Sequence, residues 1–312
     1  MARAATPAIL ALGEPMIEFN QTAPGQPGYL QGFGGDTSNA IIAAARQGAS
    51  CGYITRLGDD DFGRMFLDLW RAEGVDSSGV GIDGAAHTAV YFVTHGASGH
   101  SFSYLRRDSA ASRMQPAHLP VELIRGARIL HVSAISQAIS QSARDSVQAA
   151  IALARQAGVK VSYDTNLRLK LWPLETARRV IADTIALTDA LLPSLEDLQV
   201  VSALAAPDAI LDWCFAHGAN HVVLKLGREG CIAATGQERT KIPGHQVNAV
   251  DATGAGDCFD GAFLARLDAG DDLVAAARYA NAAAALTTTG FGAVAPLPRR
   301  SQVSSFLAAA RA

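Results

Sequence analysis

Residues 251–264 (DATGAGDCFDGAFL) have the residue types and spacing of a site that binds an anion and moves a proton. The small residues at 254–256 leave backbone N–H groups uncovered, and a helix predicted over 258–267 points its positive end at the same ligand. Such a cluster stabilises a phosphate whose negative charge grows during transfer. Asp257, in the first turn, can accept a proton from a bound hydroxyl. The string GAGD alone fits an ordinary helix start equally well, and the longer string favours the anion site.

Strands and helices that would position such a site alternate from about residue 120 onward. Residues 129–135 (ILHVSAI) and 159–163 (VKVSY) are predicted as buried strands, and 141–156 as the helix between them. This alternation is typical of βαβ units and of a parallel sheet covered by helices on both faces. In such sheets ligands bind beyond the carboxyl ends of the strands. The pattern also predicts strands over 190–192 and 221–226 and helices over 174–187, 195–202 and 208–217.

The first hundred residues differ from this pattern. A core strand is predicted over 9–13 and a helix over 37–47, ended by Gly48. Between them, residues 14–35 are rich in Gly, Pro and Gln, and residues 88–107 alternate apolar and polar residues around a Gly-Ala-Ser-Gly turn, which indicates a half-exposed hairpin. We therefore predict a main domain of residues 1–13, 36–87 and 108–312, with a small β-sheet lid from 14–35 and 88–107.

Composition excludes several classes of protein. The chain has 312 residues, 49% apolar and 18% charged, which is enough to bury a core and excludes general disorder. A net charge of −3 without charged blocks, and only 6% aromatic residues, give no support for binding nucleic acid or a membrane. Four unpaired cysteines and the lack of a recognisable export signal lead us to expect free thiols and a cytoplasmic location.

Motifs of other enzyme classes are missing from the sequence. There is no Gly-x-x-x-x-Gly-Lys-Ser/Thr loop and no His-Glu-x-x-His, and no Gly-x-Gly-x-x-Gly string follows a strand that the sequence predicts. The eight histidines are scattered without metal-ligand spacing. A dinucleotide-dependent oxidoreductase would need a Gly-rich βαβ unit near the N-terminus, and the sequence lacks one.

Several motifs together resemble the PfkB, or ribokinase-like, family of sugar kinases. Residues 251–263 resemble the second signature of that family, and 34–39 (GGDTSN) its early substrate-binding turn. Residues 57–63 and 73–76 match further landmarks, so the resemblance runs from residue 9 to about 298. It implies a three-layer α/β/α sandwich with a mostly parallel central sheet and a small β-sheet lid. It also implies ATP, Mg²⁺ and a sugar as ligands.

Three segments resemble one member group, the 2-keto-3-deoxygluconate kinases: residues 13–19 (GEPMIEF), 104–112 (YLRRDSAAS) and 164–168 (DTNLR). The resemblance implies phosphorylation of this acid sugar to its 6-phosphate. Arg106 and Arg168 would then bind the sugar carboxylate through their planar guanidinium groups. For Arg106, a solvated pair with Arg107 on an exposed sheet is the alternative. For Tyr91, packing within the sheet is as good an interpretation as hydroxyl donation to the sugar.

The resemblance assigns roles residue by residue. The acid associated with Mg²⁺ stays open between Glu196 and Asp197. The reason is that residues 194–197 (SLED) stand where the family usually has Asn-x-x-Glu. The catalytic group comprises Asp257 as base with Gly254, Ala255 and Gly256. The residues expected to bind the sugar, besides Asp257, are Gly34, Gly35, Asp36, Asn39, Tyr91, Tyr104, Arg106 and Arg168. The residues expected to bind ATP are Asn166, Arg168, Lys225, Gly227, Gly230, Gly254 and Gly256. A monovalent cation such as K⁺ would be bound by Asp251 and Thr253.

Two alternatives remain open at this point. The same fold could act on fructose, ribose or a nucleoside, or it could be a non-catalytic sugar-binding regulator. The exposed edge and apolar face of the predicted lid also lead us to expect a homo-oligomer formed through it.

Overall fold

The computed structural model describes residues 6–96 and 99–309. The outermost residues of the predicted main domain, 1–5 and 310–312, and residues 97–98 in the predicted hairpin turn lie outside the described residues.

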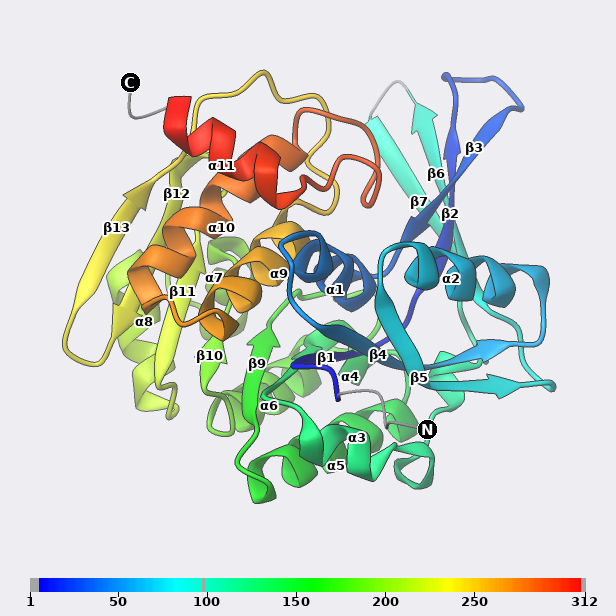
Figure 1. Cartoon of the computed structure of the whole chain (residues 1–312), viewed down its shortest axis with the longest axis horizontal. Helices are drawn as coiled ribbons and strands as arrows, with labels where there is room; N and C mark the ends of the chain where they lie inside the picture. Colours follow the sequence, from blue (N-terminus) through cyan, green and yellow to red (C-terminus); the bar gives the residue numbers. More distant parts are fainter. Residues whose placement is uncertain (1–5, 97–98, 310–312) are drawn as a thin grey trace.

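A nine-stranded sheet runs through the molecule (Figure 1). The neighbouring strands β5, β4, β1, β8, β9, β10 and β11 are parallel. At one edge, β12 and β13 are added in antiparallel orientation. The order is β13 (Arg239–Pro243), β12 (Gly230–Thr235), β11 (His221–Lys225), β10 (Ala190–Leu191), β9 (Lys160–Asp164), β8 (Ile129–Ser133), β1 (Ile9–Leu12), β4 (Cys51–Gly58) and β5 (Val75–Asp83).

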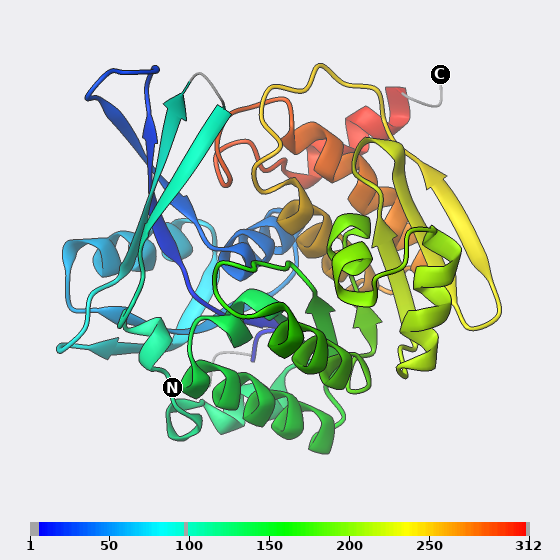
Figure 2. The ribbon, with the colours of Figure 1, turned by 180° about the vertical axis from the view of Figure 1, so that it is seen from behind.

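Helices cover both faces of this sheet, as the two views show (Figures 1 and 2). One layer contains α1 (Asp36–Arg46), α2 (Asp61–Ala72), α9 (Ala255–Asp268), α10 (Leu273–Thr287) and α11 (Arg300–Ala309). The other contains α3 (Val121–Gly126), α4 (Ala134–Ala138), α5 (Gln141–Gln156), α6 (Leu174–Ile185), α7 (Leu195–Ser202) and α8 (Pro207–Ala216). Short 3₁₀ turns are η1 (Ala111–Arg113), η2 (Pro116–His118) and η3 (Gly227–Glu229).

The alternation of side chains along β1 explains why the sheet has two cores. Ile9 and Ala11 pack into the cluster under the first helix layer, and Leu10 and Leu12 into the cluster under the second. A strand with both faces buried is apolar throughout, which is why its sequence reads as a continuous run. The predicted three-layer α/β/α fold is confirmed.

A second, four-stranded sheet stands apart from the main layers (Figure 1). Its order is β3 (Tyr29–Gly34), β2 (Met16–Gln21), β6 (Ala89–Gly96) and β7 (Gly99–Leu105), with β2 and β6 parallel and the other pairs antiparallel. All four strands lie within the segments 14–35 and 88–107, so the small separate sheet is confirmed. Its action as a lid stays a prediction.

Two details concern expectations from composition. The four cysteines are free and buried. Within residues 6–96 and 99–309, no single helix has both the length and the apolar character to span a membrane, although the bent pair α7 and α8 together reaches that length and composition.

Candidate active site

A cleft of about 1770 Å³ opens where the parallel strands end, and residues of the small sheet line its other side. Asp164 ends β9 and Lys225 ends β11, and both side chains line it, as expected for ligand sites in open α/β sheets. The predicted residues brought together here are Gly35, Asp36, Asn39, Tyr91, Tyr104, Arg106, Asn166, Arg168, Lys225, Gly227, Thr253, Gly254, Gly256 and Asp257. Gly34, Gly230, Asp251 and Ala255 do not line it.

Asp257 lies in the first turn of α9, beside the uncapped N–H groups of that helix end. Asn39 Nδ2 donates to its Oδ2 over 2.8 Å, which holds the carboxyl in one orientation. Burial, followed by repulsion from Asp36, raises the pKa of Asp257 from 3.8 to about 7. A carboxylate of this basicity is suited to taking a proton from an alcohol near neutral pH.

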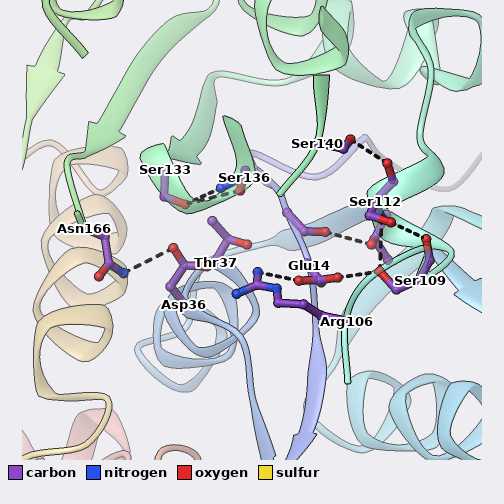
Figure 3. A network of polar contacts seen from close by, with 12 residues as sticks. Glu14, Asp36, Thr37, Arg106, Ser109, Ser112, Ser133, Ser136, Ser140 and Asn166 are labelled. Atoms are coloured by element: carbon purple, nitrogen blue, oxygen red, sulfur yellow. Dashed lines mark hydrogen bonds and ion pairs between the residues drawn. The ribbon is translucent and has the colours of Figure 1, made fainter. Parts of the chain in front are cut away.

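Close packing of α1 against α9 brings these groups together. A side chain at Gly261 would place its Cβ 2.0 Å from the Ala40 carbonyl oxygen, so only glycine allows the two helices to approach this closely. Asn39 and Asp36 on α1 thereby face Asp257. Asn166 Nδ2 donates to Asp36 Oδ2 over 3.2 Å from the loop after β9 (Figure 3).

The amide cluster at the start of α9 differs from the predicted one in extent. The helix begins at Ala255, three residues earlier than predicted, because Gly254 adopts a left-handed φ of 74° and ends the preceding turn. The Ala255 N–H donates to the Ala252 carbonyl over 3.2 Å, so it is already engaged. Gly256 is open: a Cβ there would approach only Lys225 Nζ, at 3.8 Å.

Lys225 does not extend freely toward the cleft. Its Nζ lies 2.9 Å from Asp260 Oδ1 and 3.2 Å from Asp164 Oδ1, and the side chain is only 12% exposed. Although burial opposes it, these two carboxylates raise the pKa of Lys225 above its ordinary value. Sequence reasoning missed Asp164 and Asp260; the available signal was Asp260, an acid one turn after Asp257 in an otherwise apolar stretch.

Arg106 is held by a buried acid at the base of the small sheet (Figure 3). Its Nη2 lies 2.5 Å from Oε2 of Glu14, which is completely buried, and Ser109 Oγ donates to Glu14 Oε1 over 2.6 Å. Glu14 precedes β2 and Arg106 follows β7, so the contact joins the two chain crossings between sheet and main body. Arg106 is therefore not a free guanidinium, and its predicted use as a carboxylate clamp stays a prediction.

The tyrosines of the small sheet take different positions. Tyr91 is buried and its hydroxyl donates to Glu18, so the packing interpretation describes it better. Gly34 serves this packing, since a Cβ there would lie 2.6 Å from the Tyr91 hydroxyl. Tyr104 is 39% exposed, stacks on Tyr91 and lies under the Arg106 guanidinium. Tyr104 therefore remains the more accessible hydroxyl.

The two glycines predicted to bind ATP in the loop after β11 have different surroundings. Gly227 lines the cleft, whereas Gly230 has a left-handed φ of 97° and packs against the Ile242 carbonyl at the β12–β13 hairpin. Gly230 is thus a structural turn residue.

Asp251 binds its own loop. Its Oδ1 accepts from Thr253 N and Oγ1, and its Oδ2 accepts from Gly292 N over 3.0 Å. These bonds fix the chain entering α9 to the segment after α10. A cation there stays a prediction.

The acids considered for Mg²⁺ lie at the start of α7. Ser194 caps this helix, and Glu196 and Asp197 line the cleft. Burial, with repulsion from Asp164, raises the pKa of Asp197 above its ordinary value. Among the described residues, no three His, Cys, Asp or Glu side chains gather as a ready-made metal site.

Comparisons with known proteins fit this geometry. The family model described as pfkB family carbohydrate kinase matches residues 7–300. "Probable fructokinase-3" of Arabidopsis thaliana is 35% identical over 96% of this chain and 91% of its own length, and "Fructokinase-1" of Oryza sativa subsp. japonica is 34% identical over 97% and 98%. A fructokinase structure from Vibrio cholerae O395 with fructose, ADP and calcium ion superposes with a TM-score of 0.88 at 29% identity, covering 97% of this chain and 100% of that one.

These relatives overturn one expectation. Further plant proteins at 34% identity over 95–96% of the chain are also named fructokinases, so the predicted action on 2-keto-3-deoxy-D-gluconate is wrong. The pairing of Arg106 with Glu14 supplies a physical reason, because the guanidinium expected to hold the sugar carboxylate already has a carboxylate partner.

Proposed function

The chain belongs to the pfkB family of carbohydrate kinases, and from this premise we propose that it transfers the γ-phosphoryl group of ATP to a hydroxyl of fructose. The observation that carries the proposal is Asp257, held by Asn39 beside the open start of α9, at the cleft where the strands end.

The proposed mechanism uses this arrangement directly. A sugar hydroxyl bound next to Asp257 loses its proton to the carboxylate as its oxygen attacks the γ-phosphorus in line, and ADP leaves. The N–H groups around Gly256 and the positive end of α9 stabilise the charge on the phosphoryl oxygens. Little covalent chemistry falls to the protein, so positioning supplies most of the rate enhancement.

The residues near the nucleotide side also fit Mg²⁺. This ion is usually bound by one or two carboxylates together with substrate phosphates and water, and Asp197 and Glu196 offer carboxylate oxygens at the cleft. Bound there with ATP, Mg²⁺ would neutralise charge on the phosphates. Related solved structures contain ATP with Mg²⁺, or ADP with a calcium ion.

The acids of the cleft suit the hydroxyl groups of a sugar such as fructose. Asp36, Asp164 and Asp257 line the cleft, and Arg106 and Lys225 are both paired with buried carboxylates. Hydroxyl groups of a sugar can donate to these acids.

A substrate panel tests the proposal. Purified protein with ATP and Mg²⁺ is incubated with fructose, ribose, a nucleoside and 2-keto-3-deoxygluconate, and ADP is measured by a coupled assay. We expect the highest kcat/KM with fructose. A higher value with another sugar would overturn the substrate, and no phosphorylation of any of them would favour a sugar-binding regulator.

The pH dependence of kcat/KM is a second expected result. Because the pKa of Asp257 is raised to about 7, the carboxyl is protonated and inactive as a base below that pH. Activity should fall about tenfold per pH unit below neutrality. Initial rates between pH 5 and 8.5 measure this limb, and a flat profile down to pH 5 would contradict a base of this pKa.

Two glycine substitutions separate ligand binding from folding. In Gly256→Ala the new methyl group faces the cleft without a backbone clash, so we expect an unchanged Tm and a kcat/KM for ATP lower by roughly 10²-fold, because the phosphates are displaced. In Gly254→Ala the methyl group would lie 2.7 Å from the Ala293 carbonyl at a left-handed φ, so Tm should fall. Thermal unfolding and ATP kinetics of both variants give the comparison.

Two further expectations belong to this proposal. The small sheet would close over the sugar and keep water from the γ-phosphate. Exposed apolar side chains on its two edge strands, Leu30 on β3 and Phe102 and Leu105 on β7, favour a homo-oligomer. Light scattering after size exclusion would give the number of subunits.

A further inference from the structure

Asp260 lies one turn beyond Asp257 on α9 and is 1% exposed, yet it contacts neither the cleft nor solvent. Its carboxylate instead receives Lys225 Nζ at 2.9 Å (Oδ1) and 3.2 Å (Oδ2). A buried carboxyl is expensive unless paired. The mechanism proposed above makes no use of it.

The position of Lys225 suggests why the acid is kept. Its Nζ is 3.8 Å from where a Cβ of Gly256 would be, directly behind the first turn of α9 that carries Asp257. Asp260 and Asp164 hold the ammonium as ion-pair partners at 2.9 and 3.2 Å. Without Asp260 the ammonium would keep only Asp164 as an ion-pair partner, and Asp257 is the next acid whose charge acts on this buried cation.

We propose that Asp260 is a positioning residue that acts through Lys225: it keeps the ammonium paired away from Asp257, so that the carboxylate of Asp257 stays free to take the substrate proton. This inference rests on the proposed function of Asp257 as the base.

The groups facing Asp257 come from five elements. A direct pair between Asp257 and Lys225 would favour the ionised carboxylate and make it a weaker base. Burial and the acids Asp36 and Asp164 act in the opposite direction. The groups that act on Asp257 are Asp36 and Asn39 on α1, Asp164 on β9, Lys225 on β11, Tyr91 on β6 and Cys258 on α9 itself.

The test measures the titration of Asp257 in the free protein, and so does not depend on turnover. Aspartate is labelled with ¹³C at Cγ, and the Asp257 signal is assigned by its loss in Asp257→Asn. In Asp260→Asn we expect the Asp257 midpoint to fall by about one to two pH units, because Lys225 turns to it. In Lys225→Met we expect the midpoint to rise, because the attracting charge is gone.

Kinetics and folding controls complete the design. If Asp260→Asn fails to fold, the double variant Lys225→Met/Asp260→Leu removes both partners and should give a midpoint at or above that of the unmodified chain. Asp268→Asn, on the same helix but paired with Arg128 at the surface, should leave the midpoint unchanged. With fructose and ATP, Asp260→Asn should lower kcat and shift the acid limb downward with little change in KM.

An unmoved Asp257 midpoint in both Asp260→Asn and Lys225→Met would overturn the inference. A midpoint below that of the unmodified chain in the double variant would overturn it as well. A chain that phosphorylates no sugar would instead count against the proposed function, and the titration would still decide the role of Asp260.

Discussion

Asp257→Asn should lower kcat by about 10²–10⁴-fold while the KM for ATP stays nearly constant. The substitution keeps the shape of the side chain, and its amide oxygen can still accept from Asn39 Nδ2. It removes only the ability to take a proton, which is worth this factor in enzymes that use a general base. Steady-state kinetics with fructose at pH 8 measure the effect. If more than about a tenth of kcat remained, Asp257 would not be the base.

The stability of the same variant offers an independent check. The folded-state pKa of Asp257 is raised from 3.8 to about 7, so the folded chain binds more protons than the unfolded chain between these values. Stability therefore falls as pH rises through that window. Asparagine does not titrate, so the variant should have a higher Tm than the unmodified chain at pH 8 and a similar one at pH 4. Asp271→Asn, whose acid pairs with Arg266 away from the cleft, is the matched control for both measurements.

The regular elements of the main domain were predictable because each carries a local pattern. The helix predicted over 141–156 is α5 with the same bounds, and the strand predicted over 221–226 is β11, one residue shorter. The predicted start of α9 is three residues late. In the sequence Gly254 and Gly256 look alike as loop glycines, whereas in the structure Gly254 alone has the left-handed φ and Gly256 is helical.

The site was predictable where one segment carries it and unpredictable where the fold assembles it. Asp257 stands in a continuous motif, but its partner Asn39 is 218 residues away and reaches it only because α1 packs on α9. The pairing of Arg106 is unpredictable for a similar reason. The sequence predicts Arg106 as a carboxylate ligand, with a solvated pair as the alternative, and nothing near it reveals that Glu14, 92 positions earlier, is buried against it.

Glu14→Gln should destabilise the fold by about 3–5 kcal/mol, because it leaves a mostly buried guanidinium without its counter-charge. Glu14 is fully buried and Arg106 is only 12% exposed at the cleft, so water replaces the lost partner poorly. The loss is large against the roughly 5–15 kcal/mol of total stability of a typical domain. Denaturant unfolding followed by circular dichroism gives the free energy of unfolding.

Two comparisons isolate the ion pair at the base of the small sheet. The double variant Glu14→Gln/Arg106→Met should recover most of the loss, since removing both charges leaves no unpaired ion. Glu122→Gln breaks an exposed pair with Arg125 and should cost less than about 1 kcal/mol. If Glu14→Gln were as mild as Glu122→Gln, the contact would not fasten the two chain crossings. If it is severe, the four-stranded sheet is anchored to the main body through this charge pair.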